Sequence, residues 1–205
     1  MPRRPDATRN KILDAANRLF YGKGIRAVSL DALAEQAGVT KKTLYYHFRS
    51  KDDLVAAYLA SRDQPNLATF AKWFEEAEGS LADKVQALFT QLAKSARSPK
   101  WKGCGFLRTA AELADLPGHP AVKVGAGHKK KFEDWLAARI ACVDPENATL
   151  RSRQIVLLMD GAFSIMLIHR DPAYIEAAGL AGRALVCHDA VQSAQMPTQN
   201  RGARP

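Results

Sequence analysis

Apolar residues recur at three- and four-residue spacing along most of this chain, which places them on one face of a helix. The first such face, within residues 6–24, is formed by Ile12, Leu13, Ala16, Leu19 and Phe20. Further helices are predicted around Leu81–Leu92, Phe106–Ala114, Phe132–Ile140 and Tyr174–Val186. No segment shows the alternation of apolar and polar residues that a half-buried strand requires. The pattern therefore predicts an all-α fold.

Two short helices are predicted close together near the N-terminus. Ser29 and Thr40 are residue types that cap helix N-termini, and they open helices over residues 29–37 and 40–48. Gly38 breaks the chain between them. Two short helices joined by a glycine-containing turn are typical of the helix-turn-helix unit, whose second helix lies in the major groove of DNA.

A fourth helix is predicted to begin at Ser50, and its apolar face holds Leu54, Val55, Tyr58 and Leu59. The sequence Gln64-Pro65-Asn66 interrupts this pattern. We therefore expect a first domain over residues 6–66, with its helix-turn-helix at 29–48, and a second domain over residues 67–191. Residues 192–205 are polar and contain Pro and Gly, and we expect them to be disordered.

Positive charge is concentrated at the N-terminal end of the chain, whose formal net charge is +9. Residues 1–62 hold 12 Lys and Arg against 6 Asp and Glu, whereas residues 63–205 hold 18 against 15. A local excess of this kind is expected where a protein meets a polyanion. The alternative is that the positive charge only favours solubility.

The second helix of the helix-turn-helix has two chemically different sides. Leu44 and Phe48 share the side expected to pack on other helices, while Lys42, Thr43 and Tyr46 lie opposite. The opposite side is either a DNA contact or an ordinary solvated face. Lysines in the first turn of a helix interact unfavourably with the helix dipole. Contacts to DNA phosphates would compensate for this cost, so the presence of lysines here favours the DNA-binding alternative.

The segment from Leu33 to Leu54, LAEQAGVTKKTLYYHFRSKDDL, resembles the signature of TetR/AcrR-type transcriptional regulators, and the resemblance covers about the first 60 residues. It implies a three-helix DNA-binding head on a larger helical body that binds a ligand and dimerises. It further implies a homodimer on a near-palindromic operator in double-stranded DNA. Most members of this family are repressors that a small molecule releases from DNA.

The resemblance also implies which residues contact DNA. It places Lys41, Lys42, Thr43 and Tyr46 near base edges, and the Leu30 backbone, Tyr45, His47 and Lys51 near phosphates. Thr40 either caps its helix, contacts phosphate, or does both. His47 either contacts DNA or bonds the backbone. Arg3, Arg4 and Arg9 form either a minor-groove arm or a solvated tail.

The segment Ile155–Ile168 is apolar almost all round, so we expect it to be buried on more than one side. Together with Tyr174–Val186 it would form a four-helix interface between two copies of the chain. The alternative is a helix wholly inside the core of one chain.

Ten residues of the second domain are either plain core or contacts to a small-molecule effector: Phe70, Trp73, Phe74, Trp101, Cys104, Phe106, His128, Met159, Phe163 and Met166. Cys104 lies between two glycines and is either a reactive thiol or an inert buried one. A hydrolase with Cys104 as nucleophile and His119 or His128 as base is the alternative function, but no catalytic motif supports it. A non-specific architectural DNA binder would not need so large an apolar body.

Composition excludes several other classes of protein. Hydrophobic residues make up 47% and charged residues 25%, as in ordinary globular domains. Three widely spaced cysteines form neither a disulfide framework nor a metal-binding pair, so we expect a reducing cytoplasm, no metal and no cofactor. No signal peptide follows the basic N-terminus, and Ile155–Ile168 is too short to span a membrane.

Overall fold

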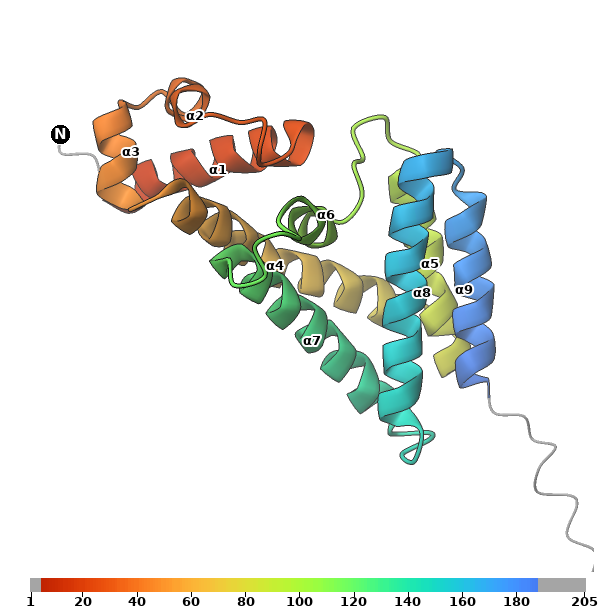
Figure 1. Cartoon of the computed structure of the whole chain (residues 1–205). Coiled ribbons are helices and arrows are strands. Elements are labelled where there is room, and N and C mark those ends of the chain that lie inside the picture. Colours follow the sequence, from red (N-terminus) through yellow and green to blue (C-terminus); the bar gives the residue numbers. More distant parts are fainter. Residues whose placement is uncertain (1–4, 188–205) are drawn as a thin grey trace, which may run out of the picture.

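The computed structural model describes residues 5–187, and every regular element within that range is a helix (Figure 1). The helices are α1 (Pro5–Lys23), α2 (Leu30–Ala37), α3 (Lys41–His47), α4 (Lys51–Glu75), α5 (Leu81–Ala96), α6 (Gly105–Glu112), α7 (Pro120–Ile140), α8 (Ala148–His169) and α9 (Ala173–Val186). The predicted all-α fold is confirmed. The expectation for residues 192–205 concerns a segment outside the described residues.

Two groups of helices lie at opposite ends of the molecule (Figure 1). We call α1, α2, α3 and the first half of α4 the head, and the remaining helices with the second half of α4 the body. The long helix α4 runs from the head into the body alongside α7, while α5, α8 and α9 stand side by side at the far end. Within the body, α6 lies on the side toward the head.

Side-chain caps set the ends of the helix-turn-helix. The Ser29 hydroxyl accepts a hydrogen bond from the N–H of Ala32 at 3.1 Å, and Thr40 Oγ1 accepts one from the N–H of Thr43, also at 3.1 Å. Between the two helices Gly38 adopts φ 63°, a left-handed conformation that glycine reaches at low cost. The predicted caps and the predicted break are thus confirmed, and α3 is held in a fixed orientation.

The core of the head is shared with the body. Leu33, Leu44 and Leu54 are completely buried at its centre. Three body residues, Phe106, Leu113 and Ala121, belong to the same apolar cluster. Phe106 lies in α6 and Leu113 directly follows its last residue, so a shift of α6 changes the packing of the head.

The predicted interruption at residues 64–66 is wrong. Helix α4 continues through Pro65 to Glu75 as a single helix of 25 residues. Proline removes one backbone hydrogen bond from a helix interior, but the flanking turns are held by buried side chains such as Leu59 and Phe74. A domain boundary between residues 66 and 67 therefore falls inside a continuous helix, which joins head and body mechanically.

The body is built around Phe89 of α5, whose side chain is fully buried. Helix α9 approaches it closely because Gly179 and Gly182 face the ring. A Cβ atom added at Gly179 would lie 2.7 Å from the Cβ of Phe89, which is closer than packing permits. The small residues of α9 therefore set the distance between α5 and α9.

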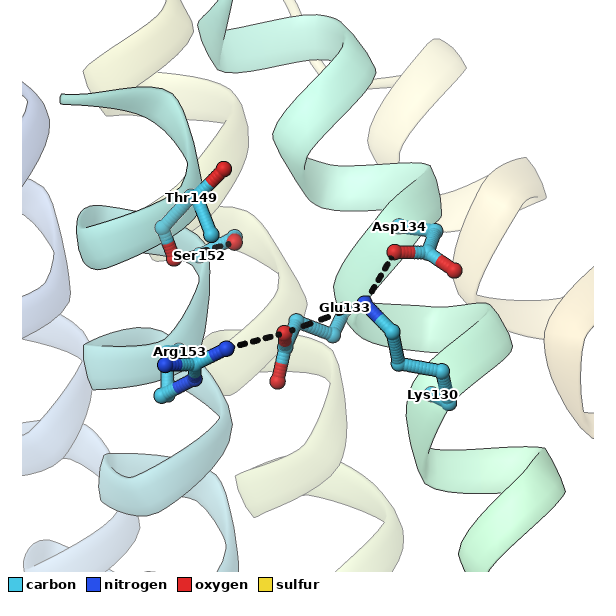
Figure 2. A network of polar contacts seen from close by, with 6 residues as sticks. All are labelled: Lys130, Glu133, Asp134, Thr149, Ser152 and Arg153. Atoms are coloured by element: carbon cyan, nitrogen blue, oxygen red, sulfur yellow. Dashed lines mark hydrogen bonds and ion pairs between the residues drawn. The ribbon is translucent and has the colours of Figure 1, made fainter. Parts of the chain in front are cut away.

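Polar contacts fix α7 against α8 (Figure 2). The Glu133 carboxylate accepts hydrogen bonds from Lys130 on its own helix and from Arg153 on α8, both at 3.3 Å. Such pairs near the surface contribute at most about 1 kcal/mol each, so they align helices that apolar packing already holds together. No helix within residues 5–187 is long and apolar enough to cross a membrane.

Candidate nucleic-acid interface

Helix α3 separates an apolar side from a polar side. Leu44 is completely buried and Phe48, which follows the last turn, is 4% exposed. On the other side Lys42 and Tyr46 are exposed, and 79% of Tyr46 is open to solvent. The predicted division of this helix into a packed side and a free side is confirmed.

Lys41 is held by an acidic residue of the preceding helix. Its Nζ lies 3.0 Å from Oδ1 and 3.1 Å from Oδ2 of Asp31. The hydrogen bond to Asp31, together with the charge of that carboxylate, raises the pKa of Lys41. We did not predict this pair, although Asp31 is an acidic residue within a basic stretch and was visible as such in the sequence.

The side-chain oxygen of Thr40 has a structural role at the start of α3. It accepts the N–H of Thr43 as the cap of α3, and the two hydroxyl oxygens of Thr40 and Thr43 lie 2.8 Å apart. The capping alternative for Thr40 is therefore confirmed, and its contact with phosphate stays a prediction. His47 is half-buried, with its ring edge-on to Tyr46 at 5.1 Å.

The other residues expected at phosphates lie on α3 or beside it. Leu30 is the first residue of α2, where backbone N–H groups lack partners within the helix. Tyr45 is 49% exposed. Lys51 begins α4 and is half-buried, and this burial lowers its pKa.

A shallow hollow beside α3 brings together Thr40, Thr43, Tyr46 and His47. Thr8 of α1 also lines it and was missed by the sequence reasoning, because no local pattern connects it to α3.

Arg9 of α1 is fixed on the head, since its guanidinium lies 5.3 Å from the centre of the Phe48 ring. It is therefore not part of a solvated tail. Arg3 and Arg4 lie outside the described residues.

A cavity of about 470 Å³ lies between α1 of the head and α4, α5, α6, α7 and α8. Eight of the ten candidate effector residues line it: Phe70, Trp73, Trp101, Cys104, Phe106, His128, Met159 and Phe163. Phe74 and Met166 do not. Phe74 lies instead in the apolar core with Lys84 and Arg139 over its ring, each at 5.5 Å, and Met166 faces the end of α5.

Polar residues that the sequence reasoning missed also line this cavity. Asn17 comes from α1, and Tyr58, Arg62 and Asn66 follow one another along a single face of α4. Their four-residue spacing was the signal available in the sequence. Burial raises the pKa of Tyr58 to about 12, although the nearby Arg62 opposes this rise.

His128 is engaged in a buried polar pair. Its Nδ1 lies 2.8 Å from Oδ1 of Asp63, and its ring stacks on Phe106 at 3.8 Å. Burial lowers the pKa of His128 more than Asp63 raises it. Burial opposes ionisation of Asp63 as well, yet hydrogen bonds from Lys131 and His128 outweigh it and lower the pKa of that carboxyl.

The arrangement expected of a hydrolase is not formed. His119 does not line the cavity that holds Cys104, because it caps α7 and contacts Asp52 of α4 at 3.2 Å. Within residues 5–187, no hydrogen bond joins Cys104 to His119 or to His128. In the same range no group of three His, Cys, Asp or Glu side chains is placed to hold a metal ion.

Helix α6 links the cavity to the head. The Glu112 carboxylate accepts the backbone N–H groups of Ile25 at 2.7 Å and Arg26 at 3.1 Å. Arg26 returns a hydrogen bond from Nε to the Glu112 carbonyl at 2.8 Å. The opposite end of α6, at Gly105 and Phe106, lines the cavity.

Helices α8 and α9 carry an apolar strip on the surface of the single chain. Only one side of the segment Ile155–Ile168 packs on the core, so the expected burial on several sides is not met within one chain. Leu157 is 67% exposed, and Leu180 of α9 is 59% exposed. A hollow between the two helices is lined mainly by apolar side chains, with Gln154 and Tyr174 also on its wall.

Comparison with known proteins shows that the head is similar to the DNA-binding part of bacterial regulatory proteins. The family model described as "Bacterial regulatory proteins, tetR family" matches residues 12–58. The HTH-type transcriptional regulator SrpR of Pseudomonas putida is 42% identical over 60 residues, which is 29% of this chain and 28% of SrpR. TtgR, an HTH-type transcriptional regulator of the same species, is 35% identical over 95 residues, 44% of this chain and 45% of TtgR. The chain thus spans less than half the length of either relative.

Similarity to a solved structure extends over nearly the whole molecule. The crystal structure of SCO4454, a TetR-family transcriptional regulator from Streptomyces coelicolor, superposes with a TM-score of 0.75 at 31% identity. The match covers 88% of this chain and 94% of SCO4454.

Proposed function

Because this chain belongs to the TetR family of bacterial regulatory proteins, we propose that it is a dimeric, sequence-specific repressor of transcription, released from its operator by a small-molecule effector. The observation that carries the proposal is α3, whose apolar residues are buried while its cationic and phenolic side chains project outward. A short rigid helix of this kind fits the major groove of DNA. It would act in the cytoplasm, where bacterial DNA lies.

The first turn of α3 reads bases in this proposal. In helix-turn-helix proteins the N-terminal residues of the second helix contact base edges, and here these are Lys41, Lys42 and Thr43. Tyr46, one turn later, shares their exposed side. The phosphate contacts come from Tyr45 and His47 of α3 and from three residues beside it, Leu30 through its backbone, Thr40 and Lys51.

Dimerisation through Ile155–Ile168 and Tyr174–Val186 accounts for the exposed apolar strip. Burial of apolar surface contributes about 25 cal/mol per Å² before the costs of association. Two copies of α8 and α9 packed together would hold two α3 helices at a fixed separation. A near-palindromic operator with half-sites about 34 Å apart, one turn of DNA, or a multiple of that distance, matches such symmetry.

The cavity and the head are mechanically coupled in this proposal. A ligand that contacts Gly105 and Phe106 displaces the first turn of α6. The other end of α6 is bonded to the head through Glu112 and packs into its core through Leu113. The ligand therefore favours a state in which the two α3 helices are no longer spaced for DNA. The ligand shifts the equilibrium between the two states by the difference between its binding free energies for them. A nearly complete shift, from 1:99 to 99:1, requires a difference of about 5.5 kcal/mol.

Selection from a random-sequence DNA library tests the proposed function. The full chain is expected to enrich a site with two-fold symmetry, and log affinity for that site should fall linearly with log salt because phosphate contacts release counterions. Enrichment of no common sequence would contradict specific binding. A site without symmetry would contradict the dimer.

A further inference from the structure

The wall that α4 contributes to the cavity changes from polar to aromatic along its length. Tyr58, Arg62 and Asn66 occupy successive turns at the end nearest the head, and Phe70 and Trp73 follow toward the far end. Asn17 of α1 adds a further polar group from the head. A bound molecule therefore meets hydrogen-bonding groups at one end and aromatic rings at the other.

The charge of the cavity wall is positive. Among residues 5–187, Arg62 and Lys129 line it and no Asp or Glu does. Lys129 is neutralised by an ion pair with Asp160. Arg62 forms no ion pair within residues 5–187, and its only side-chain hydrogen bond there is a long one of 3.4 Å to Asn66. The Arg62 guanidinium is thus the uncompensated cation of the cavity.

Tyr58 offers a second donor at the same end. The residue is 3% exposed, it lines the cavity, and its hydroxyl forms no hydrogen bond within residues 5–187. Because this hydroxyl opens into the cavity and has no protein partner, it can donate a hydrogen bond to a ligand oxygen. Gly105 keeps space open there, because a Cβ added at Gly105 would lie 3.1 Å from the Tyr58 oxygen.

The far end of the cavity suits a flat ring. Phe70 packs edge-on to Trp73 at 5.5 Å, and Trp101 lies nearly parallel to Phe163 at 6.0 Å. Aromatic walls bind planar apolar groups through both burial and ring geometry. The cavity volume of about 470 Å³ is within the range that holds small ligands.

We propose that the effector is an aromatic carboxylate, with its carboxylate bonded by Arg62 and Tyr58 and its ring between the aromatic side chains of the far end. This inference rests on the proposed function and names its ligand class. A single guanidinium and a single hydroxyl match a monoanion with two oxygens. A ligand cation would instead lie against Arg62 with no carboxylate to compensate it. The carboxylate end also contacts α1, so binding ties the ligand to the head.

Isothermal titration calorimetry on the full chain tests the charge preference with three probes that share one ring system and differ in the charge of its substituent. These are 2-naphthoate, the neutral 2-naphthamide and the cationic 2-naphthylmethylamine. The carboxylate is expected to bind at least about tenfold more tightly than the other two, the gain of a charge-assisted hydrogen bond. Equal or tighter binding of the amide or amine, or no binding of 2-naphthoate at millimolar concentration, would overturn the inference.

Variants test the assigned donors. Arg62→Gln is expected to weaken 2-naphthoate about tenfold or more while leaving 2-naphthamide nearly unchanged. Tyr58→Phe removes only the hydroxyl and should weaken the carboxylate by a smaller factor. Lys72→Gln removes a cation from α4 outside the cavity and is the matched control, with unchanged binding expected. A carboxylate preference that survives Arg62→Gln would refute the role of Arg62.

DNA binding by the same preparations separates this inference from the proposed function. If the protein holds its selected site and the amine rather than the carboxylate releases it, the ligand class is wrong and the regulator stands. If the protein selects no DNA site, the proposed function fails even where 2-naphthoate binds to the cavity.

Discussion

Lys41, in the first turn of α3, lies 3.0 Å from a carboxylate oxygen of Asp31 in α2. The pair is exposed on both sides and links α2 to α3 across the turn at Gly38. It orients Lys41 and also withdraws part of its charge from the surface proposed to meet DNA. In the proposed complex, Lys41 would give up the Asp31 carboxylate and bond phosphate or base oxygens of DNA instead.

Replacement of Asp31 by Asn is expected to strengthen DNA binding severalfold. Lys41 then has no ion pair to break before it contacts DNA. The gain should shrink as salt is raised, since the interactions exchanged are screened. Fluorescence anisotropy over a salt series measures it. Glu35→Gln removes an exposed acid from the same helix and is the control. An equal gain in both variants would show that general charge, rather than the pair, is responsible.

Replacement of Leu157 by Glu is expected to separate the dimer. A charge placed within a buried apolar interface is strongly unfavourable, so the dissociation constant of the dimer should rise about a hundredfold or more, and operator affinity should fall with it. Analytical ultracentrifugation measures the assembly state. Leu116→Glu alters another exposed leucine, in a loop away from the strip, and a dimer weakened by both changes would contradict the proposed interface.

Replacement of Glu112 by Ala is expected to uncouple the cavity from the head. Two backbone N–H groups lose their acceptor, which lowers the free energy of unfolding by about 1–3 kcal/mol. The variant should still bind its operator but respond less to effector. Thermal denaturation and effector-dependent DNA release are the two measurements. Glu78→Ala, at an exposed loop position, serves as control; full effector response in Glu112→Ala would argue against this route of coupling.

Acidification is expected to destabilise the body through His128. Burial lowers the pKa of His128 from its ordinary 6.5, so the unfolded chain binds protons that the folded chain refuses. Stability therefore falls as the pH drops below about 6.5. Asp63 acts in the same direction at lower pH, because its folded pKa is below the ordinary 3.8. Denaturant unfolding between pH 7 and 5.5 should show a smaller decline in His128→Gln, whereas His169→Gln at an exposed site keeps the full decline.

Local signals made the head predictable from the sequence. Ser29, Gly38 and Thr40 each act through their immediate neighbours, so their residue types alone fix the helix ends. The burial of Leu44 follows from helical spacing. Lys41 and Asp31, by contrast, meet through the angle between two helices, which no local pattern encodes.

The body was less predictable for the same reason. Pro65 predicts a helix break, yet side-chain packing on both sides of it keeps α4 continuous. The aromatic residues of the cavity were found by type, but type did not distinguish Phe74, which lies in the core, from Phe70, which faces the cavity. The polar lining at Arg62 was overlooked because a charged residue on a helix is usually solvated.

Operator binding by Lys42→Ala and Tyr46→Ala tests the central claim most directly, because both side chains project from α3 and neither supports the core. Each change is expected to abolish measurable binding to the selected DNA site while the melting temperature stays that of the unaltered protein, and Lys94→Ala on α5 should retain full affinity. Unchanged DNA affinity in the two α3 variants would contradict the placement of α3 at the DNA surface.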